Sequence, residues 1–175
     1  MVVDSLKRSI LIFSFCLLSL FSHSQEGVLT IKGAVEKGKE PLNNATITLL
    51  HNNSEVKSIR TDNDGIFRLE MEIDKKYTIK FSKDEFVAKK IFVDATVPGD
   101  RGGAWTVEFS IGLFEMYPGL DVSALKKPVT KIKYKEKERG FGYDYLYTEK
   151  MMGKIDKILR QLEHLKEEAY REIIR

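Results

Sequence analysis

A series of short alternating segments, separated by turn clusters, constrains the fold of this chain most. The strongest turn cluster is Asp62-Asn63-Asp64-Gly65, in which Asp-Gly supplies the positive φ angles of a tight β-turn. Apolar and polar residues alternate on both sides of it, as in half-buried strands. About seven such segments predict a mainly β fold, a small sandwich or partial barrel rather than βαβ units. They span 28–35, 45–50, 56–60, 66–71, 77–81, 87–93 and 105–113.

The acidic turn has a second interpretation, as part of a calcium loop. Such a loop needs further oxygen ligands and a closing Glu, and none follows at the required spacing, so we expect a hairpin turn. His51 and His164 stand alone in the sequence, without the His-Glu-x-x-His spacing of a zinc site. We therefore expect no catalytic residue, no metal ligand and no cofactor.

The order of these residues resembles the carboxypeptidase regulatory-like domain. The shared string has a glycine in the first strand, Pro-Leu, a small residue opening the second strand, Thr-Asp-x-x-Gly-x-Phe-x-Leu, and Tyr-x-Ile. Here these positions are Gly33, Pro41-Leu42, Ala45, Thr61-Asp62, Gly65, Phe67, Leu69, Tyr77 and Ile79. The resemblance implies an antiparallel, transthyretin-like β-sandwich over 25–116, related in shape to some carbohydrate-binding modules. It also implies an accessory role, common in exported proteins of Bacteroidota-type bacteria.

The N-terminus has the pattern of a secretory signal peptide. Lys7 and Arg8 precede the apolar run 10–21, and Ser22-His23-Ser24 ends it, so we expect cleavage between Ser24 and Gln25. An uncleaved membrane anchor is the alternative, but the run is shorter than the roughly 20 residues that a membrane helix needs. We expect an exported protein in the periplasm or at the outer-membrane periphery of a diderm bacterium, without a transmembrane span after cleavage.

Composition excludes several kinds of chemistry. The one cysteine, Cys16, lies inside the expected signal peptide, so the mature chain has no disulfide, thiolate or cysteine-zinc site. The chain has 29 Lys and Arg residues and 26 Asp and Glu residues. Removing Lys7, Arg8 and Asp4 leaves 27 against 25. This near balance does not indicate a nucleic-acid partner.

A charged and aromatic connector is expected over 117–147, after the sandwich. Within it, aromatic rings recur at every second position, so an extended segment would place all four on one face: Phe141, Tyr143, Tyr145 and Tyr147. An aromatic face can stack on sugar rings or on a partner surface. The alternative is that the strip packs on the sandwich and attaches the tail, because an exposed strip is a liability.

A long amphipathic helix is expected over 148–175, with Thr148 as its N-cap. Apolar residues at alternating spacings of four and three form a heptad seam: Met151, Ile155, Ile158, Leu162, Leu165 and Ala169. The seam can fold back on the sandwich, pair with a second copy or dock on another protein. We expect Ile155, Ile158, Leu162 and Leu165 to serve attachment or association and not the folding of the sandwich.

Together these patterns predict a non-enzymatic envelope protein. Its sandwich would act as an accessory or interaction module, and its C-terminal helix would contact another envelope protein or a second copy. A carbohydrate-binding module that uses the aromatic strip for a glycan is the alternative. Exposed, coplanar rings would favour the glycan, and rings packed against the sandwich would remove its basis.

Overall fold

The computed structural model describes residues 27–99 and 102–174. The expected signal peptide, 1–24, lies outside them. The described residues form two sheets followed by one long helix, which confirms the mainly β fold. The elements are β1 Val28–Lys37, β2 Glu40–Pro41, β3 Thr46–His51, β4 Ser54–Arg60, β5 Ile66–Glu72, β6 Lys76–Ser82, β7 Lys89–Asp94, β8 Ala104–Gly112, η1 Ser123–Lys126, β9 Thr130–Lys135, β10 Gly140–Tyr143 and α2 Tyr145–Ile173.

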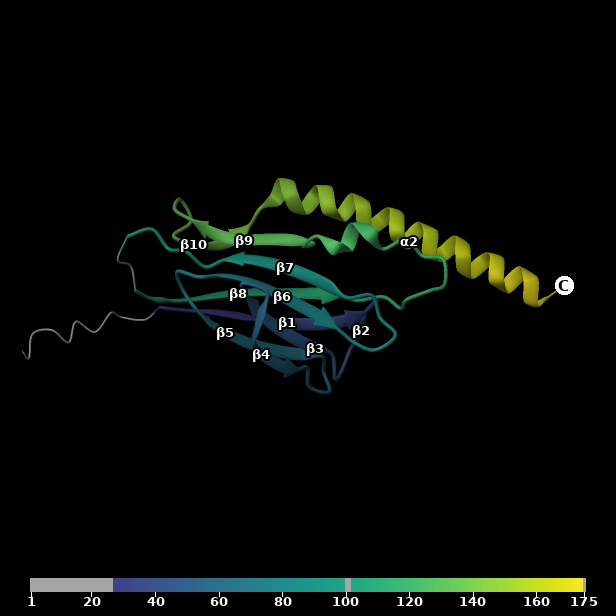
Figure 1. Cartoon of the computed structure of the whole chain (residues 1–175), viewed down its shortest axis with the longest axis horizontal. Helices are drawn as coiled ribbons and strands as arrows, with labels where there is room; N and C mark the ends of the chain where they lie inside the picture. Colours follow the sequence, from purple (N-terminus) through teal and green to yellow (C-terminus); the bar gives the residue numbers. More distant parts are fainter. Residues whose placement is uncertain (1–26, 100–101, 175) are drawn as a thin grey trace, which may run out of the picture.

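The first sheet is built around β1. Strand β1 pairs antiparallel with β2 and β5 and parallel with β8, so β8 forms one edge of this sheet. The second sheet has the order β10-β9-β7-β6-β3-β4, with β7 and β9 parallel and the other neighbours antiparallel. Helix α2 runs beside β9 and extends past the ends of the strands (Figure 1). The arrangement brings β7, β8, β9, β10 and α2 to one side of the sandwich.

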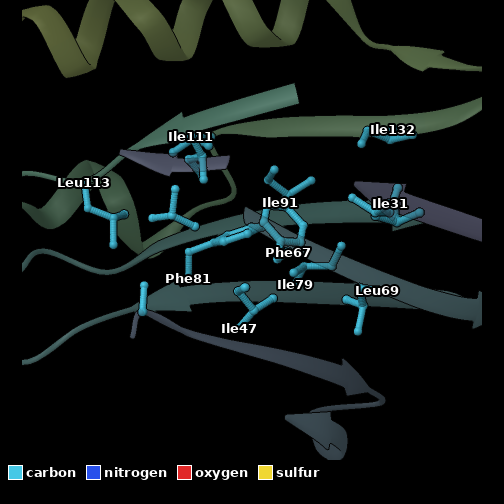
Figure 2. Packing of buried hydrophobic residues seen from close by; sticks show 14 of the residues in the cluster. Ile31, Ile47, Phe67, Leu69, Ile79, Phe81, Ile91, Ile111, Leu113 and Ile132 are labelled. Carbon is cyan, nitrogen blue, oxygen red and sulfur yellow. The ribbon is translucent and has the colours of Figure 1, made fainter. Parts of the chain in front are cut away.

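Alternating residues of the strands fill the space between the two sheets. Strand β5 buries Phe67, Leu69 and Met71, and β6 buries Tyr77, Ile79 and Phe81, as their period-two patterns predict. Side chains from both sheets meet in one layer (Figure 2). Each of these large apolar side chains contributes roughly 1.5–3 kcal/mol when fully buried. The core is therefore the main source of stability for the described part of the chain.

The Asp62–Gly65 turn is a structural hairpin. The Asp62 carboxylate accepts hydrogen bonds from the backbone N–H groups of Asp64, at 3.0 Å, and Ile66, at 2.8 Å. Gly65 has φ +72°, and a Cβ there would lie 2.5 Å from the Val35 carbonyl oxygen. The turn thus uses its acidic side chain to satisfy backbone donors, as expected for an Asx-type turn.

Strands β9 and β10 lie inside the segment for which we expected a connector, so the sheets extend beyond residue 116 and the strands outnumber the expected seven or so. Strand β9 pairs in parallel with β7, with Thr130 opposite Ile91 and Ile132 opposite Val93. Its inward residues alternate with outward-facing lysines, and these lysines gave the segment its charged composition. The many charged residues of this segment therefore favoured a connector, although β9 has one buried face.

The helix begins at Tyr145, earlier than expected, and its N-cap is Asp144 and not Thr148. The Asp144 carboxylate accepts from the backbone N–H of Tyr147 at 3.2 Å. The Thr148 hydroxyl instead donates to the Asp144 carbonyl oxygen at 2.8 Å. The alternating tyrosines indicated an extended segment, and the Asp144 cap overrode that local preference.

The first half of α2 belongs to the sandwich core. Ile155, Ile158 and Leu162 are buried in the same cluster as the strand residues, packed beside Leu125 of η1. Of the three alternatives for the seam, folding back describes this part of the helix. The expectation that Ile155, Ile158 and Leu162 do not serve the folding of the sandwich is therefore wrong. Residues of η1 and β9 extend the core cluster as far as the helix. No helix among the described residues combines the length and apolar character needed to cross a membrane.

Candidate functional site

An apolar groove lies between α2 and the side of the sandwich. Its volume is about 530 Å³. Strands β7, β8 and β10, the start of β9 and the first half of α2 supply its walls. Apolar lining residues include Ile91, Phe109, Ile111, Val129, Ile155 and Leu159. The groove is the concave, mostly apolar kind of surface that small-molecule sites use.

The edges of the two sheets meet beside the groove through aromatic contacts. Trp105 of β8 packs edge-on against Phe141 of β10, with ring centroids 5.8 Å apart, and against Tyr134 of β9 at 6.1 Å. The Tyr143 hydroxyl donates to the Glu108 carbonyl oxygen at 3.2 Å. These contacts join β8 to β9 and β10 near the start of β8. The groove is lined by the later residues of β8, from Phe109 to Gly112, and by residues of α2.

Lys89 is the one basic side chain among the described residues that line the groove. Strand β7 places Lys89, Ile91 and Val93 on its buried face, and Lys89 is only 8% exposed. Its Nζ lies 5.1 Å from the centroid of the Phe114 ring, a cation–π distance. Burial lowers the pKa of Lys89 to about 8. The amine is therefore mostly charged at neutral pH, although it lies among apolar walls.

None of the ion pairs found in residues 27–99 and 102–174 includes the Lys89 amine. Asp156, on α2, lines the same groove but forms no such pair with it. The other ionisable groups of the lining are Tyr143 and Tyr145, and burial raises the pKa of Tyr143. Burying an ammonium group without a counter-ion costs free energy, so the groove favours an anionic ligand group at this position.

The four aromatic candidates do not share one face. Phe141 packs against Trp105, and Tyr147 donates its hydroxyl to the Pro128 carbonyl oxygen at 2.7 Å. Tyr143 and Tyr145 both line the groove, with their rings inclined by 62°. Since α2 begins at Tyr145, the strip ends at β10 and the rings form no coplanar platform. The geometry on which the glycan alternative depended is therefore missing from this segment.

The four helix candidates also have different surroundings. Ile155 lines the groove as well as the core, whereas Ile158 and Leu162 are buried in the core alone. Leu165 is half-buried against the cluster. The structure thus brings Tyr143, Tyr145 and Ile155 together, and leaves the other candidates in packing positions.

Sequence reasoning does not single out Lys89, the one basic residue among the described residues that line the groove. The residue lies in a predicted strand, two positions before Ile91 and four before Val93. That period-two spacing places the lysine on the buried face, and a lysine on a buried face is rare without a partner. The signal was present in the alternation, but the neighbouring Lys90 made the pair resemble a solvated charge cluster.

The histidines take no part in the groove. His51 Nδ1 lies 2.9 Å from the Lys76 carbonyl oxygen, and His164 lies 3.3 Å from a carboxylate oxygen of Glu168. Within residues 27–99 and 102–174, no three His, Cys, Asp or Glu side chains gather closely enough to hold a metal ion.

No known family pattern matches the chain, and no curated protein matches it. Among solved structures, a region is similar to the Bacillus anthracis TIE protein, with 15% identity over 51% of this chain and 18% of that chain and a TM-score of 0.42. A DUF3823 family protein from Parabacteroides merdae shows 16% identity over 51% and 47%, with a TM-score of 0.37. A 3-chlorocatechol 1,2-dioxygenase from Rhodococcus opacus shows 11% identity over 54% and 62%, with a TM-score of 0.40.

This chain spans less than two thirds of the length of each of these three proteins. The likeness is a distant structural similarity to β-sandwich proteins, without assignment to a family.

Proposed function

We propose that this protein is a non-enzymatic binding protein of the cell envelope, with a carboxypeptidase regulatory-like sandwich as its binding module. The groove between α2 and the sandwich carries the proposal, because it offers about 530 Å³ of mostly apolar space on a rigid framework. Ligand sites for small molecules typically occupy about 300–1,000 Å³ and are largely preformed. The signal-peptide pattern and the accessory-type resemblance support export and a role without catalysis.

The walls of the groove combine rigid and adaptable parts. Ile91 and Ile111 come from strands and belong to the core, so they are held in place. Tyr145 and Met152 come from α2 and are 66% and 51% exposed. Exposed apolar side chains beside a cavity mark interaction surfaces, and methionine adapts its shape to different ligands. An apolar molecule would cover these two side chains and remove them from water.

Binding of a neutral, environment-sensitive dye such as Nile red to the purified protein tests the proposal. We expect saturable binding with enhanced emission. Ser110 lies on β8, exposed, and lines the groove, so Ser110→Trp should fill the space and abolish binding without disturbing the core. Ser58→Trp, at an exposed position of β4, is the matched control and should bind normally. Equal binding by both variants, or none by the wild type, would contradict a ligand site in the groove.

The overhanging end of α2 favours a second function, contact with a protein partner. Beyond Leu165, which is half-buried against the core, the helix continues to Ile173, and the large apolar residues near its end are exposed. Tyr170, Ile173 and Ile174 are 66%, 81% and 65% exposed. An amphipathic helix of this kind can lie in an apolar groove of another protein. Four glutamates against Lys166 and Arg171 over 163–174 favour a groove with a basic rim.

Site-specific photo-cross-linking from Tyr170 tests this second function in cells that express the protein. We expect cross-links to an apolar, basic-rimmed groove of one other protein, mapped by mass spectrometry and lost in Ile173→Glu. Glu172→Gln is the matched control and should leave the cross-links in place. Cross-links between two copies of this chain would replace the partner by self-association, and the absence of any would overturn the docking role of the overhang.

A further inference from the structure

The buried lysine of the groove is the least expected side chain in the described core. Strand β7 directs Lys89 inward with Ile91 and Val93, where aliphatic residues are the rule. A chain that needed only packing there would be more stable with an apolar residue, because burying an ammonium is costly unless a counter-charge accompanies it. The aromatic ring of Phe114 compensates on one side only.

The Lys89 side chain lines the groove, and its amine is not completely sealed from solvent. Among the described residues, every side-chain nitrogen or oxygen that is completely buried has a hydrogen-bond partner. No hydrogen bond of the Lys89 amine is found among these residues, so the amine belongs to the incompletely sealed groups, on a side chain that lines the groove.

We propose that the groove binds an amphiphile with a single acyl chain and a carboxylate head, with the carboxylate paired to Lys89 and the chain along the apolar walls. This inference rests on the proposed ligand site in the groove. It adds the chemical class of the ligand and the residue that recognises its head.

The charges around Lys89 favour a head with a single negative charge. Lys89 is the one cation of the described lining, and Asp156 of α2 is the one carboxylate. A phosphate with two charges would need additional donors, which phosphate sites obtain from arginines or clustered backbone N–H groups. Asp156 would also repel a doubly charged head more strongly than a singly charged one. A carboxylate needs one strong charge-assisted hydrogen bond, and a lysine can provide it.

The shape of the walls favours one chain. Ile91, Ile111 and Ile155 line the groove from three different elements, β7, β8 and α2. The volume of about 530 Å³ lies in the range of sites for one small molecule. Met152 and Leu159, about two turns apart on α2, extend the apolar wall along the helix. A linear chain buries its methylene groups along such a wall, which is the main source of its affinity.

Displacement of Nile red by three sixteen-carbon competitors, each kept below its solubility limit or micelle concentration, tests the inference. The competitors are palmitate, hexadecanol and hexadecyl phosphate. For the wild type at neutral pH we expect palmitate to bind about 10-fold to 100-fold more tightly than hexadecanol, the usual effect of one charged hydrogen bond. In Lys89→Met this preference should vanish while hexadecanol binds as before. Lys90→Met, which changes the neighbouring lysine on the outward face, should keep the preference.

The outcomes separate the inference from the proposed function. If neither palmitate nor hexadecanol displaces the dye, the groove is not a ligand site and both fail. If both displace it equally, or Lys89→Met retains the preference, the role of Lys89 fails alone. If hexadecyl phosphate binds more tightly than palmitate, the proposal of a carboxylate head is wrong.

The pH dependence of the same displacement gives an independent readout. Affinity for palmitate should fall as pH rises from about 7 to about 9.5, because Lys89 loses its proton in this range. Hexadecanol affinity, and palmitate affinity in Lys89→Met, should change little. Tyr143, Tyr145 and Asp156 are the other ionisable groups facing the groove and are common to both proteins. A palmitate profile that is identical in wild type and variant would assign the titration to them and overturn the role of Lys89.

Discussion

The side-chain hydroxyls of Thr130 and Thr148 lie 2.6 Å apart, and this hydrogen bond joins β9 to the first turn of α2. The Tyr147 hydroxyl makes a second link, to the carbonyl oxygen of Pro128 just before β9. Both links hold the start of the helix at the edge of the second sheet. The position of α2, and with it one wall of the groove, is therefore fixed by the sandwich.

Replacing Ile158 by Asp should destabilise the whole protein. Ile158 is 5% exposed and belongs to the core cluster, so the change removes a large apolar side chain and buries a carboxyl. We expect a loss of about 3–5 kcal/mol in the free energy of unfolding, measured by urea denaturation followed by β-sheet circular dichroism. Ile173→Asp, at the exposed end of the same helix, should change it by less than about 0.5 kcal/mol. Similar effects of both variants would mean that α2 is not part of the core.

Replacing Lys89 by Met should stabilise the protein without ligand. Burial lowers the pKa of Lys89 from 10.5 to about 8, so between these values the unfolded chain holds a proton that the folded chain has released. Wild-type stability therefore falls as pH decreases through this window, by roughly 3 kcal/mol at about 1.36 kcal/mol per pKa unit. The advantage of Lys89→Met should be largest near pH 7 and smallest above pH 10.5. Urea denaturation at both ends checks this, and an advantage that does not depend on pH would contradict the buried charge.

Much of the fold is predictable from local pattern, because in a half-buried strand every second residue is apolar and faces the core. Phe67, Leu69 and Ile79 occupy such alternating positions, and all three are buried. Strand β9 was not predicted, since its outward lysines dominate the composition of its segment. The start of α2 was placed late because the tyrosines at 143, 145 and 147 alternate like a strand, and only the Asp144 cap distinguishes the two cases.

The groove is harder to predict because it depends on tertiary contacts. Its walls come from segments as far apart as Ile91 and Leu159, which meet only when β9 pairs in parallel with β7. No local pattern specifies that pairing. Lys89 is the exception, since its alternation with Ile91 already indicates a buried amine.

Gly65 should tolerate substitution less well than Gly38, although both have positive φ, +72° and +66°. An alanine Cβ at position 65 would lie 2.5 Å from the Val35 carbonyl oxygen, whereas nothing lies within 4 Å of a Cβ at position 38. Gly38→Ala should cost about 1–2 kcal/mol, the usual penalty of the left-handed region. Gly65→Ala should cost more, because backbone must also move. Thermal denaturation of the two variants checks the order, and equal melting temperatures would show that the hairpin relaxes freely.

A crystal structure of the protein with palmitate is the most direct test of the central claim, that the groove beneath α2 binds a carboxylate-bearing acyl chain. We expect the chain between α2 and β8, and a carboxylate oxygen within about 3 Å of the Lys89 Nζ, the distance of a charge-assisted hydrogen bond. Palmitate bound elsewhere on the protein, or in the groove with its carboxylate turned away from Lys89 toward solvent, would contradict the claim.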